Sequence, residues 1–245
     1  MDDDRISQIE KYLGLDYSVD TKDSVIDYSF ISIPSVKDLL ECDNREMMRY
    51  RYGARYHKTN FNEFCRCAHL QSEMLLNYYY NQRNNSDLKL IKTHIQRFNP
   101  TVENLDKATS LSAISYGIKL WAFRNEYPTS NIYYTFDYLR RVRNELSHRS
   151  LEKDTFQIQE YQKELKALHI PIYPDGSINW FAINKDPVIK EIFDININKT
   201  PKYREYQYLL WYTANPYDEI TDCLNKLSNI IKEALNKDNI DIQQI

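Results

Sequence analysis

Segment 140–150, RRVRNELSHRS, holds four arginines, one asparagine and one histidine in eleven residues. Arginine stays charged and grips phosphate oxygens with a planar fork, whereas histidine exchanges a proton near neutral pH. RNA can break its own backbone through the 2′-hydroxyl when one group moves a proton and a cation stabilises the charge that grows on the phosphate. The residue types in this segment suit such chemistry, and neither role requires a metal.

A helix is expected to position these residues. Apolar side chains recur at intervals of three and four residues, at Ile132, Phe136, Leu139, Val142 and Leu146. This spacing predicts an amphipathic helix over 131–148, capped by Thr129 or Ser130. At about 100° per residue, Arg143 and His148 lie about 140° apart on one ideal helix. Two copies packed across a two-fold axis would bring two arginines and two histidines into one cleft, so we expect a homodimer.

The sequence from Arg143 to His148 resembles the motif of the HEPN ribonucleases, in which an Arg, often followed directly by Asn, precedes a His by a few residues. The flanking sequence YLRRVRNELSHRS is similar as well. HEPN proteins are small all-helical bundles, usually dimers, with a metal-independent endoribonuclease site formed by the paired motifs. The resemblance covers residues 60–168. HEPN toxins that pair with a nucleotidyltransferase antitoxin commonly carry Tyr where this chain has Ser150, which argues against that pairing.

The resemblance implies a role for each motif residue. Arg143 would bind the scissile phosphate, His148 would handle the proton, and Asn144 would orient the histidine or hydrogen-bond the phosphate. Further contacts to RNA are expected from residues close in sequence, namely Arg140, Arg141, Ser147 and Arg149. No metal or other cofactor is expected.

The activity implied is cleavage of single-stranded or loop RNA, leaving a 2′,3′-cyclic phosphate and a free 5′-hydroxyl, in a microbial defence or toxin system. Because an unregulated ribonuclease would harm its own cell, we also expect a regulatory or antitoxin partner. One alternative is a non-catalytic HEPN-like module that binds RNA, nucleotide or a partner protein. Another is a helical antitoxin or immunity-type protein. An Arg and a His five residues apart are also typical of a solvated helix face, where the helix dipole favours His148 near the C-terminus.

The remaining pattern predicts an all-α, HEPN-like bundle with a small β-hairpin near residues 170–183, turning at Pro174. We divide the chain into an N-terminal segment, 1–59, that packs on the bundle, and a helical domain, 60–245, with an insertion at about 170–200. Further helices are predicted from 35, from 60, and over 88–98, 110–123, 156–168, 203–213 and 217–235.

Composition supports long helices, because four glycines and eight prolines are few for a chain of many short strands and turns. The glycines form no phosphate-binding loop or nucleophile elbow, which argues against nucleotide-driven motors, dinucleotide enzymes and α/β hydrolases. A formal net charge of −3 argues against a duplex-DNA binder coated in positive charge. Four cysteines without C-x-x-C spacing, no signal peptide and no apolar span indicate a cytoplasmic protein. Many of the twenty-one tyrosines are expected at core margins or a subunit contact.

Two weaker patterns admit two interpretations each. Segment 45–58 mixes basic and aromatic residues, which suits single-stranded nucleic acid but equally suits a solvated face that ties the N-terminal segment to the bundle. His69 and Glu73 lie four residues apart, as a pair that supports the site or, as we expect, a plain pair on the helix surface. His94 has no carboxylate or thiol at ligand spacing and is expected to be structural or exposed.

Overall fold

The computed structural model describes residues 26–52, 60–147, 155–174, 178–197 and 203–243. Helices dominate these residues and no β-strand occurs among them, which confirms the all-α prediction. The chain divides into two compact units: unit 1 is Met1–His148 with Tyr217–Ile245, and unit 2 is Arg149–Pro216. Within the described residues, none of the helices has the length and apolar character needed to cross a membrane.

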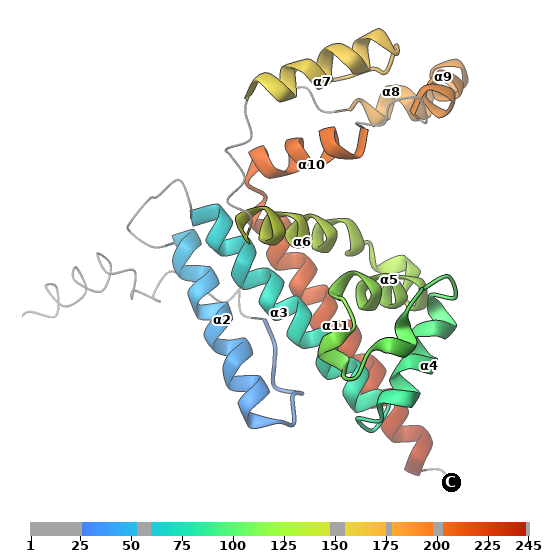
Figure 1. Ribbon diagram of the computed structural model, residues 1–245. Coiled ribbons are helices and arrows are strands. Elements are labelled where there is room, and N and C mark those ends of the chain that lie inside the picture. Colours follow the sequence, from blue (N-terminus) through green and yellow to red (C-terminus); the bar gives the residue numbers. More distant parts are fainter. Residues whose placement is uncertain (1–25, 53–59, 148–154, 175–177, 198–202, 244–245) are drawn as a thin grey trace, which may run out of the picture. The chain divides into compact units, whose positions relative to one another are not determined.

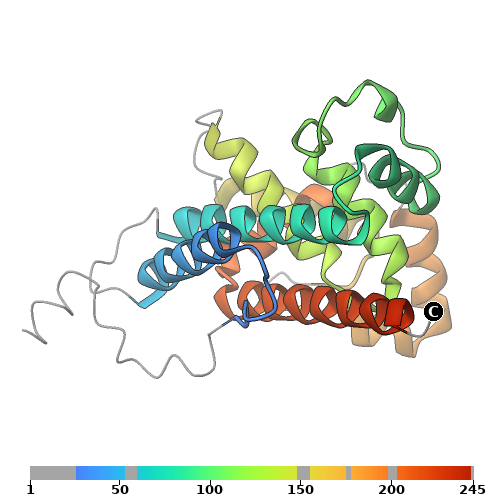
Figure 2. The same ribbon diagram turned by 90° about the horizontal axis from the view of Figure 1, so that it is seen from below.

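Unit 1 is built around one central helix. Its described α-helices are α2 (Pro34–Tyr52), α3 (Asn60–Arg83), α4 (Leu88–Phe98), α5 (Tyr116–Glu126), α6 (Tyr133–Ser147) and α11 (Tyr217–Gln243). Helices α2, α6 and α11 all pack against α3, as Figures 1 and 2 show. Helix α4 packs against α5, and α5 also contacts α6. Helices α3, α5 and α6 therefore meet around the segment whose chemistry was predicted.

Local signals set the ends of the helices next to the site. Helix α4 begins where Asp87 accepts hydrogen bonds from two backbone amides, and it ends before Pro100 as predicted. Helix α5 begins only at Tyr116, because residues 111–113 form a separate 3-10 turn and the hydroxyl of Ser115 caps the helix proper. The helix predicted over 110–123 is therefore shorter than expected.

The predicted cap of α6 at Thr129 or Ser130 is wrong. A 3-10 turn occupies Pro128–Ser130, and Asn131 adopts a left-handed backbone with φ of 55°, so the helix begins at Tyr133. Asparagine tolerates this conformation better than most residues. Four members of the predicted apolar stripe, Ile132, Phe136, Leu139 and Val142, are buried as expected, while the side chain of the fifth, Leu146, lies outside what the structure describes.

The core of unit 1 lies between α3 and the helices around it. Fully buried side chains include Phe64, Leu75, Leu76, Tyr79 and Tyr80 of α3, and Ile220, Leu224, Leu227 and Ile231 of α11. Tyr79 and Tyr80 are not among the tyrosines at the core margins, because both have no exposed surface. Their burial is tolerated because each hydroxyl has a partner, such as the Lys119 carbonyl, 2.9 Å from the Tyr80 hydroxyl.

The described part of the N-terminal segment lies on α3 and α11. The Tyr28 hydroxyl donates to Oε1 of Gln71 at 2.6 Å, and the Ser228 hydroxyl donates to the carbonyl of Asp27 at 2.7 Å. Lys232 of α11 adds an ion pair with Asp27 at 2.7 Å. These contacts fix the chain that leads into α2.

Unit 2 has a small core of its own. Its described helices are α7 (Thr155–Ala167), α8 (Trp180–Lys185), α9 (Pro187–Ile197) and α10 (Tyr203–Ala214). Leu165, Ile170, Ile178, Ile183 and Phe193 pack together inside it. The unit contains the insertion expected at about 170–200 and is longer than it.

The β-hairpin predicted near residues 170–183 is reduced to one antiparallel bridge between Ile172 and Ile178. Neither side of the bridge extends into a strand among the described residues, and directly after Ile178 the Oδ1 of Asn179 accepts a hydrogen bond from the Ala182 amide at 2.9 Å and caps α8. Turn residues 175–177 lie outside the described residues.

Candidate functional site

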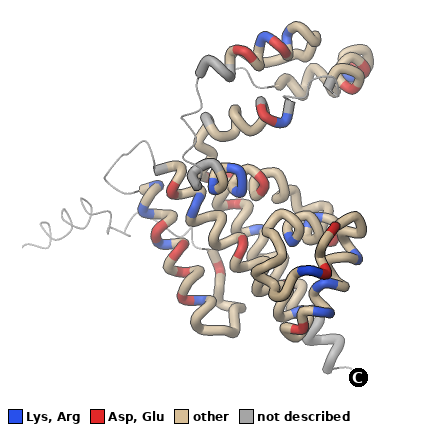
Figure 3. The backbone as a smooth tube through the Cα atoms, in the orientation of Figure 1, with Lys and Arg blue, Asp and Glu red and all other residues tan. Residues whose placement is uncertain are grey.

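The candidate site lies at the C-terminal end of α6, where the buried stripe meets the surface. Val142 is buried, the next residue, Arg143, is exposed, and Asn144 is partly buried. Nη1 of Arg143 lies 3.3 Å from Oδ1 of Asn144 and donates a hydrogen bond to it. Figure 3 shows basic residues gathered at this end of α6. The packed stripe fixes the helix, and the helix holds Arg143 at the edge of the core.

Part of the predicted site lies outside what the structure describes. His148 and Arg149 are among the residues not described, and of Ser147 only the backbone, the last residue of α6, is described. The distance between Arg143 and His148 is therefore still a matter of prediction. Arg140 and Arg141 precede Arg143 on the same helix, and their side chains leave the helix axis in directions about 100° apart.

Arg140 is held in place on α6. Its Nε and Nη2 both donate to Oδ1 of Asp137, at 2.9 and 2.7 Å. Its stem passes over Gly117 of α5, where a β-carbon would lie 3.9 Å from Cδ of Arg140. The pair is partly exposed, so a phosphate could still reach the guanidinium from outside.

His69 of α3 lies near Arg140 and Arg143 of α6. It was expected on the helix surface, but the structure buries it. Its exposed fraction is 3 %. Its Nδ1 is buried and has no hydrogen-bond partner among the described residues. Its Nε2 lies 3.8 Å from Oε2 of Glu73, too far for a hydrogen bond. The ring packs edge-on against Tyr116, with 4.5 Å between ring centroids.

The buried Lys119 also lies near Glu73, the carboxylate beside His69. Lys119 of α5 has no exposed surface, and its Nζ donates to Oδ1 of Asn77 at 2.7 Å. The same Nζ lies 3.9 Å from Oε1 of Glu73. Burial lowers the pKa of Lys119, which Glu73 partly counteracts. We call the group of His69, Glu73, Asn77, Tyr116 and Lys119 the His69 cluster.

The motif helix acts electrostatically on this cluster. Burial and, to a smaller extent, repulsion from Arg143, Arg140 and Lys119 together lower the pKa of His69 to about 4. His69 is therefore neutral at pH 7. A neutral imidazole with an unpartnered nitrogen beside two guanidinium groups can respond to an anion, because the anion's charge offsets the repulsion that keeps the ring deprotonated.

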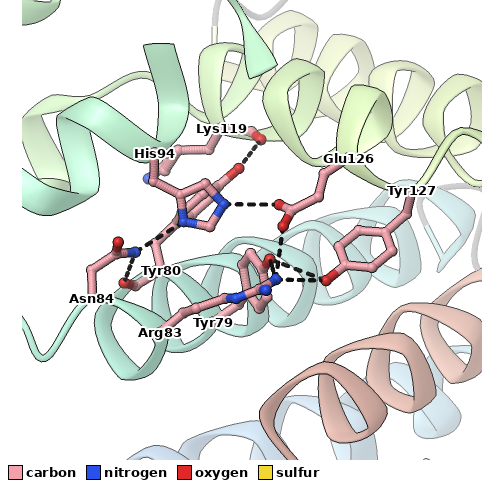
Figure 4. Close-up of polar contacts among 8 residues, drawn as sticks. All are labelled: Tyr79, Tyr80, Arg83, Asn84, His94, Lys119, Glu126 and Tyr127. Carbon is pink, nitrogen blue, oxygen red and sulfur yellow. Dashed lines mark hydrogen bonds and ion pairs between the residues drawn. The ribbon is translucent and has the colours of Figure 1, made fainter. Parts of the chain in front are cut away.

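A second polar group, which sequence spacing did not reveal, joins α3, α4 and α5 (Figure 4). Oε1 of Glu126 accepts from Nη1 of Arg83 at 2.7 Å, and Oε2 lies 3.0 Å from Nε2 of His94. Nδ1 of His94 lies 3.1 Å from Nδ2 of Asn84. The other members, Tyr79 and Tyr127, both accept from Nη1 of Arg83. We call these six residues the His94 network.

The His94 network settles which of the two expected roles His94 has. It is structural, with a partner at each ring nitrogen. Glu126 lies 32 residues from His94 in the sequence, so no local spacing signals the pair. Only the packing of α4 on α5 brings the two together.

The described part of segment 45–58 ties α2 to the bundle. Arg51 pairs with Asp218 of α11 and stacks on Tyr52, with 4.6 Å from its guanidinium carbon to the ring centroid. Arg49 pairs with Glu46 at 2.5 Å. The Arg51–Asp218 pair favours the tying role over nucleic-acid binding for residues 45–52, whereas the Arg49–Glu46 pair stays within α2. Residues 53–59 lie outside the described parts.

Comparison with family models, curated proteins and solved structures found no match to this chain. In the described parts of the sequence, no three or more His, Cys, Asp and Glu side chains form a group that could hold a metal ion. What can be said of function therefore rests on the residues of α3, α5 and α6 and on the motif in the sequence.

Proposed function

We propose that this chain is a metal-independent, HEPN-type endoribonuclease that cuts single-stranded or loop RNA in a microbial defence or toxin system. The observation that carries the proposal is the exposed side chain of Arg143, which directly follows the buried Val142 at the end of a core helix and donates a hydrogen bond to Asn144. A fixed guanidinium at the rim of a helical bundle is suited to hold a phosphodiester.

In this proposal the 2′-oxygen of the RNA attacks the adjacent phosphorus and the bond to the 5′-oxygen breaks. His148 takes part in moving the proton from the 2′-hydroxyl and supplying one to the leaving 5′-oxygen. Arg143 stabilises the charge on the phosphate oxygens, and Asn144, whose Oδ1 accepts a hydrogen bond from Arg143, orients the histidine or donates a hydrogen bond to the phosphate. The products carry a 2′,3′-cyclic phosphate and a free 5′-hydroxyl.

The proposal includes a homodimer. Arg143 and His148 lie about 140° apart on an ideal helix, so a second copy is needed to surround one phosphodiester with both residue types. A regulatory or antitoxin partner would restrain the enzyme in its own cell.

The test uses purified full-length protein and end-labelled mixed RNA, with and without a chelator. We expect cutting that the chelator does not reduce, and products that carry a cyclic phosphate. Arg143→Ala should lower the rate by about 100- to 1000-fold, the loss typical of one charge-stabilising donor, and His148→Ala should do the same.

Arg97→Ala is the matched control, because Arg97 is an exposed arginine near the end of α4, outside the site. It should cut like the wild type. The proposed ribonuclease activity would be overturned if Arg143→Ala still cut RNA, or if the wild type bound RNA without cutting it. The second result would point to the non-catalytic RNA-binding module.

A further inference from the structure

We propose that an aromatic and basic strip along α5 and α6 binds the bases of the RNA strand next to the scissile phosphate. The inference extends the proposed function by naming where the substrate strand lies. The strip consists of Trp121 and Arg124 of α5, and Tyr133, Tyr134 and Arg140 of α6.

The strip centres on Arg124. Its guanidinium carbon lies 4.7 Å from the ring centroid of Trp121, 4.8 Å from that of Tyr133 and 5.7 Å from that of Tyr134. The rings of Trp121 and Tyr133 also meet edge to face, with centroids 5.2 Å apart. One cation therefore holds three aromatic rings in a fixed arrangement, which lowers the entropy lost when a base stacks on them.

Two of these rings lie on the surface and take no part in the core. Tyr134 is 62 % exposed and Trp121 is 37 % exposed, whereas the buried side chains of α5 include Leu120 and Phe123. Single exposed aromatic residues are common on protein surfaces. Three aromatic side chains gathered around an arginine, by contrast, form a surface on which the flat face of a base can stack.

The strip runs toward the motif. Arg124 contacts Tyr133. Gly117 precedes Arg124 by seven residues, about two turns of α5, and lies under the stem of Arg140. Helices α5 and α6 therefore run antiparallel along this surface. Tyr133 and Arg140 are seven residues apart on α6, about 10 Å, and Arg143 lies about 5 Å further along. On an ideal helix Arg140 lies about 20° from Tyr133 and Arg143 about 60° further round in the same sense, so a single strand could place its phosphate at Arg143 and bases further along the strand on Trp121 and Tyr133. Tyr134 extends this surface on the other side of Arg124.

Charge favours RNA over a second protein as the occupant. Arg124 and Arg140 lie in the strip, with Arg141 and Arg143 on the same helix. Asp137, the acidic residue beside them, is already paired with Arg140. Stacking and phosphate contacts together are the means by which proteins hold single strands, and each stacked base contributes about 1–3 kcal/mol. Duplex RNA keeps its bases stacked inside and offers none to the rings.

The test measures, by anisotropy, the dissociation constant of a fluorescently labelled oligouridine in the wild type and in Arg143→Ala. The 2′-oxygens of the oligouridine are methylated, so that the wild type cannot cut it. Tyr134→Ala and Trp121→Ala should each weaken binding by about 5- to 100-fold in both backgrounds. Tyr134→Phe keeps the ring and should bind like its parent. An unlabelled duplex of equal length should compete poorly.

The matched control is Phe181→Ala. Phe181 is 68 % exposed in unit 2 and has Lys185 5.5 Å from its ring, so it resembles the strip chemically but belongs to another unit. It should leave binding unchanged. Thermal melting shows whether each variant is folded.

The strip is overturned if Tyr134→Ala and Trp121→Ala bind as tightly as their parents, or if duplex competes as well as single strand. A fall in molar mass from dimer to monomer in Tyr134→Ala, with unchanged RNA affinity, would also overturn it and make the strip a contact between copies. Tight binding that depends on the rings but leads to no cutting would support the strip as an RNA-binding surface and contradict the proposed ribonuclease activity.

Discussion

Two polar groups built on α3 differ in whether their hydrogen bonds are complete. In the His94 network both ring nitrogens of the histidine have partners, and Glu126 uses both oxygens. In the His69 cluster, Nδ1 of the buried histidine has no partner among the described residues and Nε2 lies 3.8 Å from its acid.

The two groups teach different lessons about buried polar residues. An unpaired buried group costs free energy, so natural proteins pair nearly all of them, and each exception calls for an explanation. The His94 network follows the rule and joins three helices. The His69 cluster departs from it at the point where α3 comes near the arginines of the motif helix. The first group is therefore a structural network, whereas the second leaves one buried nitrogen without a partner near the motif helix.

Breaking the His94 network should have the largest effect. Glu126→Ala leaves Arg83 and His94 partly buried without their shared carboxylate, so we expect the free energy of unfolding to fall by about 2–4 kcal/mol. Chemical denaturation measures this. Glu103→Ala, at an exposed glutamate, is the control and should stay within about 0.5 kcal/mol of the wild type. Equal stability of the two variants would contradict a structural role for the network.

The pH dependence of His69→Gln tests the open cluster. Because burial and the nearby cations together lower the pKa of His69 from 6.5 to about 4, the unfolded chain takes up a proton in this range that the folded chain does not. The wild type should therefore lose roughly 2–3 kcal/mol of stability from this group as pH falls from about 6.5 to 4, and His69→Gln should lack that part of the loss. The difference between their unfolding free energies, measured at several pH values, should shrink or reverse in acid. Parallel curves would show that the ring is not held neutral by its surroundings.

Gly117→Ala should have the smallest effect. It tests how much space lies between α5 and the side chain of Arg140. The added β-carbon would lie 3.9 Å from Cδ of Arg140, an ordinary contact. Because glycine inside a helix costs stability relative to alanine, we expect a gain of about 0.5–1 kcal/mol and unchanged RNA binding. Gly117→Leu is the comparison, since its longer side chain should displace Arg140 and weaken RNA binding. A destabilised Gly117→Ala would mean that α5 and α6 are packed more tightly there than the distance indicates.

The sequence alone determined the helical character, the buried stripe of α6 and the proline at which α4 ends, because each follows from periodicity or backbone chemistry within a few residues. The start of α6 and the second strand of the hairpin were predicted wrongly, since Asn131 and Asn179 act through backbone conformation and capping that several residue types can supply. Only the tertiary structure decided that His69 is buried, that Glu126 pairs with His94 and that Arg124 gathers three aromatic rings. These contacts join different helices, and side-chain spacing within one helix carries no information about which neighbour it will meet.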